Sequence, residues 1–234
     1  AVIADQSIAE DSTLSFVVPD GSFADVDSGD SLTYIATLAD GSELPTWLSF
    51  DGNTKTFSGT PTNDAVGNIE VAVTATDSAS ASISDTYTLT VSNTNDVPTL
   101  AGDITGSVTE DATTTTTTGT LTGADVDTGD TLTYSIAETS GTYGSIAIDS
   151  ATGEWTYTLS NTDTDTDALA ASASVTETFS AVVTDAAAAQ STAQTITITI
   201  TGANDAPVSA VIADQSIAED STLSFVVPDG SFAD

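Results

Sequence analysis

The chain of 234 residues has no cysteine, histidine or methionine, and Lys55 is its single basic residue. Without cysteine, no disulfide can stabilise the fold. Without histidine or cysteine, the chain also lacks an imidazole base, a thiolate nucleophile and the usual ligands of zinc. These absences close off most enzymatic mechanisms, so we expect no catalytic activity.

Acidic residues outnumber basic ones by 35 to 1, which gives a formal net charge of −34. Binding to nucleic acid or to an anionic membrane surface depends on Lys and Arg, so neither is an expected partner. No apolar run reaches the roughly 18 residues of a membrane span, and the first residues do not resemble a signal peptide. We expect an extracellular location, where salt screens the charge, with export signals elsewhere in the parent protein.

Two repeats organise the chain. Residues 1–25 recur without change as residues 210–234. A weaker repeat inside the chain relates Glu10-Asp11 to Glu110-Asp111, Asp25 to Asp125, Asp77 to Asp185 and Asn95-Asp96 to Asn204-Asp205. We therefore predict two related domains at residues 1–96 and 97–205, followed at 206–234 by an incomplete next copy of the first.

Apolar residues alternate with polar ones in both domains, which is typical of half-buried β-strands. The apolar members are Leu14, Phe16 and Val18; Leu32, Tyr34 and Ala36; Val71, Val73 and Ala75; Tyr87, Leu89 and Val91; Leu132, Tyr134 and Ile136; Trp155, Tyr157 and Leu159; Phe179, Ala181 and Val183; Ile196, Ile198 and Ile200. Turn-forming segments separate the strands, and no segment has convincing helical periodicity. The pattern predicts all-β Greek-key sandwiches arranged end to end.

Paired carboxylates stand out at Asp25 and Asp27 and again at Asp125 and Asp127. In an extended chain, residues i and i+2 point to the same side, so each pair directs two negative groups toward one point. A hard cation with oxygen ligands, calcium above all, is the natural occupant. An EF-hand loop is excluded, because Ala36 and Ile136 stand where its bidentate Glu would be.

Other acidic and aromatic features have simpler interpretations. Asp163, Asp165 and Asp167 favour a solvated turn, with an auxiliary ion as the alternative. Trp47 and Trp155 stand among apolar strand residues, which favours core packing over stacking on sugars. The carboxylate pairs lie at predicted domain tips rather than in a cleft, which argues against a glycosidase.

The order of these residues resembles that of cadherin repeats, which carry an early Glu, an Asp-x-Asp, a late-strand Asp and an Asn-Asp-containing linker before a Pro. Domain 1 is similar to dystroglycan-type cadherin-like domains through Leu44 to Asp51 and Phe57 to Pro61. Domain 2 is similar to the VCBS-type repeats of giant bacterial adhesins through Gly144 to Asp149, Gly153 to Tyr157 and Phe179 to Asp185. The resemblance implies tandem cadherin/immunoglobulin-like sandwiches.

The same resemblance implies Ca²⁺ at each junction between domains. The first junction would take Glu10, Asn95, Asp96, Asp125, Asp127 and Asp185. The second would take Glu110, Asn204, Asp205 and Asp234, and a junction with a preceding copy would take Asp25, Asp27 and Asp77. The number of ions per junction stays open, because the mid-domain Leu-Asp-Arg-Glu segment of cadherins is missing. Asn93 and Gly202 also stand where cadherin linkers begin with Asp.

The sequence thus predicts a calcium-stiffened spacer or fibre repeat of a large bacterial surface adhesin. Its partners would be neighbouring repeats of the same chain or identical subunits, and any surface or glycan ligand would bind other parts of the parent protein. One alternative is a filament subunit whose C-terminal tail adds a strand to an adjacent copy. A glycan-binding module that uses Trp47 is the other.

Overall fold

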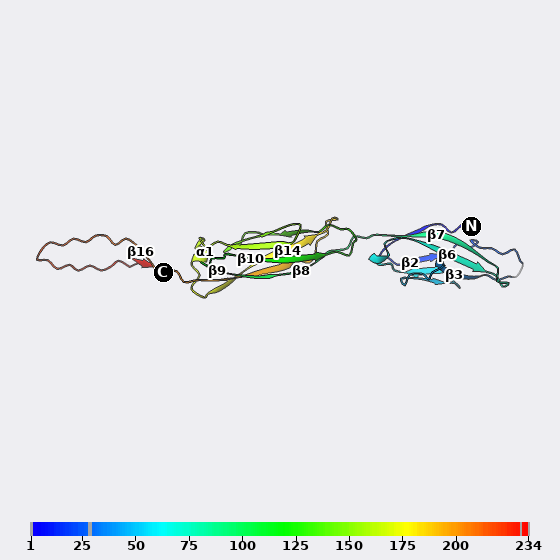
Figure 1. Ribbon diagram of the computed structural model, residues 1–234, viewed down its shortest axis with the longest axis horizontal. Helices are drawn as coiled ribbons and strands as arrows, with labels where there is room; N and C mark the ends of the chain where they lie inside the picture. The colour runs from blue at the N-terminus through cyan, green and yellow to red at the C-terminus, as the bar shows by residue number, and fades with distance from the viewer. Residues whose placement is uncertain (1, 28–29, 230, 234) are drawn as a thin grey trace. The chain divides into compact units, whose positions relative to one another are not determined.

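The computed structural model describes residues 2–27, 30–229 and 231–233 (Figure 1). Nearly all of its regular structure is β-strand, and the two short helices are η1 (Asn63–Ala65) and α1 (Thr164–Asp167). The all-β prediction is confirmed. Two compact units comprise residues 1–96 with 126–129, and residues 97–125 with 130–234. In the described ranges, neither helix has the length and apolar character needed to cross a membrane.

The first unit is a sandwich of two sheets. Its strands are β1 (Gln6–Ala9), β2 (Leu14–Val17), β3 (Thr33–Leu38), β4 (Leu48–Asp51), β5 (Thr56–Gly59), β6 (Gly67–Thr76) and β7 (Ser82–Ser92). One sheet has the order β1-β7-β6-β3 and the other the order β2-β5-β4. Because side chains alternate between the faces of a strand, Val71, Val73, Tyr87 and Leu89 point into the shared core. Phe57 lies fully buried in that core against Tyr87, with ring centroids 5.8 Å apart.

The second unit is also a sandwich of two sheets, with one more strand. Its strands are β8 (Thr99–Gly102), β9 (Thr105–Thr109), β10 (Thr116–Ala124), β11 (Thr133–Ile136), β12 (Gly144–Ile148), β13 (Glu154–Leu159), β14 (Ser174–Thr184) and β15 (Gln194–Thr201). The sheets have the orders β12-β13-β10-β8 and β11-β14-β15-β9. Trp155 is 0% exposed and donates its indole N–H to the Asp103 carbonyl at 2.9 Å, which confirms the core assignment from the sequence.

Each sandwich pairs its last strand in parallel with an early strand, the first in one unit and the second in the other. Strand β1 runs beside β7, with Ala9 opposite Ser92, and β9 runs beside β15, with Thr109 opposite Thr201. Parallel pairing brings the C-terminal ends of both strands to one edge, so the residue after the early strand meets the linker after the last. The Glu10 amide accordingly donates to the Ser92 carbonyl at 3.0 Å. The Glu110 amide donates to the Thr201 carbonyl at 2.9 Å.

The aspartate after each of these glutamates has a left-handed backbone. Its φ is 58° at Asp11 and 54° at Asp111. Aspartate tolerates this conformation better than most residues, because its short side chain can hydrogen-bond locally. The turn ends the strand and leaves the preceding glutamate beside the linker. The glutamate side chain is buried there.

The segment after the second sandwich forms one short pair of strands, β16 (Val208–Ser209) with β17 (Phe232–Ala233). Figure 1 shows the intervening residues as a long orange-to-red loop. Val211 and Val226 are 98% and 82% exposed, and no strand is assigned within residues 210–229. This segment therefore presents apolar side chains without a core of its own.

Candidate metal centres

The first candidate centre combines Glu10, Asp96 and Asp127, each of which offers a carboxylate oxygen within 4.8 Å of the others. All three residues belong to the first compact unit, which takes in residues 126–129 of the β10–β11 loop. Glu10 is 1% exposed and Asp127 is 7% exposed. One Glu10 oxygen accepts the Thr94 amide at 2.8 Å, and Asp127 accepts the Asp96 amide at 2.8 Å. The linker backbone therefore holds two of the carboxylates in place.

The second candidate centre lies at the corresponding end of the other unit and combines Glu110, Asp167 and Asp205 within the same 4.8 Å limit. Glu110 is 2% exposed and accepts the Ala203 amide at 2.9 Å through Oε2. Asp167 ends the single-turn helix α1, and Asp205 lies in the linker after β15. A surface depression of about 410 Å³, lined by Asp167 and Asp205 among others, opens beside them. The depression leaves room for waters that would complete the coordination of an ion.

The two buried glutamates share an unusual feature. Glu10 Oε2 and Glu110 Oε1 are buried and have no hydrogen-bond partner among the described residues. An uncompensated buried carboxylate oxygen costs several kcal/mol, so it needs either a proton or a cation. The buried Glu177 gives a comparison, because both of its carboxylate oxygens accept hydrogen bonds.

Glu177 is 8% exposed, comparable with the two glutamates at the candidate centres. Its Oε1 accepts the Tyr143 amide at 2.6 Å and its Oε2 accepts the Tyr157 hydroxyl at 2.7 Å. Burial, together with this hydrogen bond, raises the pKa of Tyr157 far above its ordinary value, so the hydroxyl stays a donor. Glu177 is thus satisfied by the protein alone, whereas Glu10 and Glu110 each have one oxygen without a hydrogen-bond partner and lie in groups of carboxylates.

Two further acidic groups are local to the repeated loops. One comprises Asp25, Asp27 and Asp30, and the other comprises Asp125, Asp127 and Asp130. Asp25 accepts the Asp27 amide at 2.8 Å, and Asp30 accepts the hydroxyl of Ser78. In each loop the aspartate pair offers oxygens within 4.8 Å of one another, and Asp30 and Asp130 are additional members of the two groups.

The remaining residues proposed from the sequence lie close to these groups in the chain but play local roles. Asn95 donates its side-chain amide to the Asp96 carbonyl at 2.9 Å, and Asn204 donates to the Asp205 carbonyl at 2.8 Å. Asp77 accepts the Ala79 and Ala81 amides, each at 2.8 Å. Asp185 accepts the Ala189 amide at 2.7 Å. Among the described residues Asp77 and Asp185 belong to none of the acidic groups, and Asp234 lies outside the described residues.

Asp167 is the member of the second centre that the sequence did not assign to it. Three alternating aspartates favoured a solvated turn, and the structure makes that turn a one-turn helix in which Asp163 accepts the Asp165 amide at 3.1 Å. The helix directs Asp167 toward Glu110, while Asp165 remains exposed and belongs to none of the groups found in the described ranges.

Because Asp167 belongs to the second centre and Asp165 does not, substitutions at these two positions form a matched pair of variants. If the second centre binds calcium, Asp167→Asn is expected to weaken that binding roughly tenfold or more, because it removes one of the three charges that would hold the ion. Asp165→Asn, two residues away, should leave the affinity unchanged. Isothermal titration of both variants measures this, and equal affinities in the two would remove Asp167 from the centre.

The donor set at both centres fits calcium. Calcium binds six to eight oxygens at about 2.3–2.6 Å, so oxygens up to about twice that distance apart can share one ion. The 4.8 Å limit within each group meets this condition. Each centre also has a buried oxygen that lacks another partner, and its ligands are carboxylates, the ligand type that hard cations prefer.

Lys55 does not enter these groups. Its ammonium forms an ion pair with Asp20 at 2.5 Å and lies 5.8 Å from the centroid of the Tyr34 ring. Asp20 is almost fully exposed in this pair. The arrangement is an ordinary surface ion pair, in which the Lys55 hydrogen bond holds the pKa of Asp20 below its usual value.

Comparisons with known proteins agree with this architecture. Residues 1–92 match the family model described as "Putative Ig domain", and residues 95–202 match the one described as "Bacterial cadherin-like domain". Domains of both kinds are typically structural modules without catalysis. No curated protein sequence matches the chain.

Solved structures of cadherin ectodomains share the fold. Protocadherin gamma B2 extracellular cadherin domains 3–6 superpose with a TM-score of 0.57 at 15% identity, covering 88% of this chain and 47% of that one. Mouse cadherin-23 EC22-24 gives 0.50 at 17% identity, covering 86% of this chain and 63% of that one. The chain spans less than two-thirds of either structure, and such identities show the fold alone. Residues 1–92 are thus similar to Ig domains and residues 95–202 to bacterial cadherin-like domains, and the chain has the fold of cadherin ectodomains.

Proposed function

We propose that this chain is a calcium-stiffened structural spacer of a large extracellular bacterial adhesin. The observation that carries the proposal is the pair of buried glutamates, Glu10 and Glu110, each with one partnerless oxygen beside two other carboxylates. A solvated acidic surface would not bury those oxygens. A cation explains both the burial and the clustering.

Calcium would act on the linker after each sandwich. Without it, two carboxylates about 4 Å apart repel by about 1 kcal/mol in water and about 4 kcal/mol near a protein surface, so the acidic segments separate. With it, one ion joins the end of a first strand, through Glu10, to a linker residue, Asp96, and to a loop residue, Asp127. A linker residue held by an ion that also binds a strand end and a loop restricts the bending of the linker. Stiffness is the property that a spacer requires.

Repetition of the chain supports the spacer role. Residues 210–234 repeat residues 1–25 without change, as expected of tandem copies in a longer protein. In such arrays the length and stability add repeat by repeat. The sequence resemblance to VCBS-type repeats and dystroglycan-type domains points to a surface adhesin as the parent protein.

Thermal unfolding and small-angle scattering, each measured with calcium and with chelator, test the proposal. We expect calcium to raise the melting temperature and to narrow the distribution of conformations seen in scattering. Asp125→Asn combined with Asp127→Asn should abolish most of the calcium response of residues 1–96. Glu43→Gln, an exposed acidic residue outside the groups found in the described ranges, is the control. A response unchanged in the double variant would remove Asp127 from the first centre and Asp125 from the neighbouring acidic group.

A further inference from the structure

A neutral side chain touches the first candidate centre from outside the group of carboxylates. Asn63, the first residue of η1, donates its side-chain amide to Asp96 Oδ2 at 2.7 Å, and the contact is partly buried. Asp96 is one of the three carboxylates of that centre. A hydrogen bond to a charged acceptor is roughly twice as strong as one between neutral groups. Asn63 therefore holds a candidate ligand without adding a charge.

The turn that carries Asn63 is also fixed to the end of β1. The carbonyl of Pro61, a buried residue, accepts the amide of Asp11 at 2.8 Å. The pyrrolidine ring restricts the backbone there, which limits the freedom of the turn. Asp11 follows Glu10, so the same turn contacts the strand end that supplies Glu10 and the linker that supplies Asp96.

Two further hydrogen bonds connect the linker with the centre, and both come from backbone amides. Thr94 donates to Glu10 at 2.8 Å, and Asp96 donates to Asp127 at 2.8 Å. These bonds fix the path of the linker, whereas the bond from Asn63 fixes the carboxylate of Asp96 itself. Three carboxylates in such a group repel one another, so a donor to one of them offsets part of the repulsion.

The corresponding turn at the second centre carries a carboxylate instead. Helix α1 lies between β13 and β14 in the chain, as η1 lies between β5 and β6. Strand β6 lies between β7 and β3 in its sheet, as β14 lies between β15 and β11, so the two turns are counterparts. In α1 the group that approaches the linker is Asp167, within 4.8 Å of Glu110 and Asp205. The same turn thus presents a neutral donor at one centre and an acidic group at the other.

We infer that Asn63 is a positioning residue of the first centre. Its amide keeps the Asp96 carboxylate beside those of Glu10 and Asp127 before an ion binds, so less conformational freedom is lost on binding. It also limits the charge of the centre, because an asparagine stands where its counterpart turn supplies an aspartate. The inference rests on the proposed calcium function and assigns Asn63 no direct contact with the ion.

Two substitutions at this position are expected to move the calcium affinity in opposite directions. Asn63→Ala removes the donor and should weaken binding roughly fivefold, as for the loss of one hydrogen bond. Asn63→Asp places a fourth carboxylate next to Asp96 and should strengthen binding roughly tenfold, because affinity rises with the number of charged ligands. Isothermal titration with calcium measures both in the full chain, which also carries Glu110→Gln to weaken the second centre.

Melting in chelator provides a measurement that needs no ion. The first sandwich should melt at a lower temperature with Asn63→Ala than with Asn63, and at a lower temperature still with Asn63→Asp, because the new carboxylate repels Asp96. Asn68→Asp is the matched control. Asn68 is exposed on β6, so this substitution adds the same charge to the same unit and should change neither the affinity nor the melting temperature.

The possible results separate this inference from the proposed function. Unchanged affinity in Asn63→Ala, or weaker binding in Asn63→Asp, would overturn the positioning role and leave the calcium function standing. Equal shifts in Asn68→Asp and Asn63→Asp would also overturn it, because added charge alone would then explain the effect. Absence of calcium binding in the chain that retains Asn63 and Glu110 would overturn the proposed function, and this inference with it.

Discussion

Replacing Glu110 by glutamine is expected to lower the melting temperature of the second sandwich in calcium and to raise it slightly in chelator. The two signs differ because the substitution removes a calcium ligand and also removes a buried charge. In chelator, glutamine keeps an acceptor for the Ala203 amide, and the neutral group is cheaper to bury than a carboxylate with an unpartnered oxygen.

The size of the effect in calcium follows from linkage. An ion at a hundredfold excess over its Kd stabilises the folded state by about 2.7 kcal/mol, and the variant loses most of this. For a domain of this size the corresponding drop in melting temperature is on the order of 10 °C. Differential scanning calorimetry in both conditions measures it.

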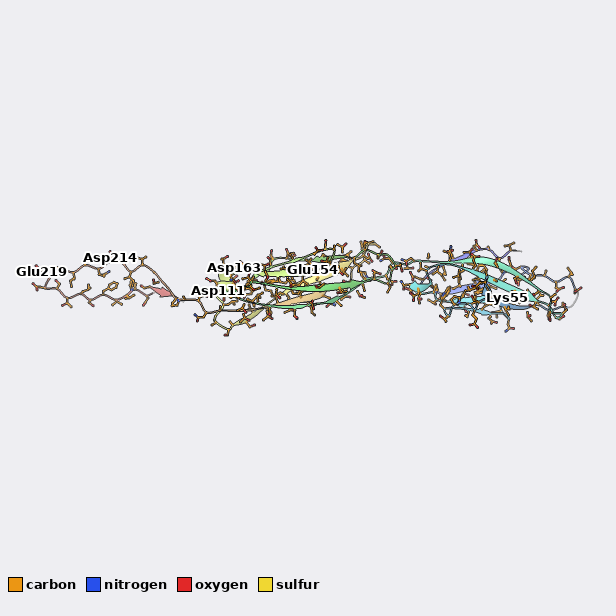
Figure 2. The ribbon with its side chains drawn as sticks, in the orientation of Figure 1. Lys55, Asp111, Glu154, Asp163, Asp214 and Glu219 are labelled. Carbon is orange, nitrogen blue, oxygen red and sulfur yellow. The ribbon has the colours of Figure 1, made fainter. Side chains whose placement is uncertain are left out.

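Glu154→Gln is the control for the same sandwich. Glu154 is exposed on β13, where Figure 2 labels it, and belongs to none of the acidic groups that the described residues form. It should change the melting temperature little, and equally in calcium and chelator. If Glu110→Gln lowered the melting temperature by the same amount in both conditions, Glu110 would be a structural residue and not a ligand.

Replacing Trp155 by alanine is expected to have the largest effect on stability without calcium. The side chain is fully buried, and its indole donates to the Asp103 carbonyl at 2.9 Å. Gly119 leaves space for the ring, since a Cβ there would lie 2.5 Å from Trp155 Cζ2. A cavity of this size costs about 3–5 kcal/mol in the free energy of unfolding, much of the stability of a single domain.

Urea denaturation of the chain in chelator measures this loss as a shift of the transition of the second sandwich. Thr156→Ala, on the exposed face of the same strand, should shift that transition by less than about 0.5 kcal/mol. The transition of the first sandwich is an internal control, because its separate core does not include Trp155. A loss below about 1 kcal/mol would mean that Trp155 is not a central core residue.

The strands were the most predictable part of the structure. Alternation placed Tyr87, Leu89 and Val91 on one face of β7, and all three are buried. The run Thr113 to Thr118 carries no such signal: β10 begins only at Thr116, and residues 113–115 precede it. A threonine run has no apolar alternation that would mark where the strand starts.

The sequence identified Glu10 and Glu110 as candidate metal ligands, but it did not predict that their side chains are buried. A Glu before an aspartate pair reads as a surface residue, and only the parallel pairing of β1 with β7 brings Glu10 under the linker at Thr94. Asp167 was harder still, because its position depends on a one-turn helix with no periodic signal. Both depend on contacts between residues distant in the sequence.

Direct calcium binding is the decisive measurement. Equilibrium dialysis of the chelator-treated full chain against calcium should show saturable binding of at least two ions per chain, one for each buried glutamate. The variant that combines Glu10→Gln with Glu110→Gln should lose most of that binding, while Glu43→Gln with Glu154→Gln should keep it. Binding that is absent, or that survives in the first double variant, would contradict the assignment of these acidic groups as calcium centres.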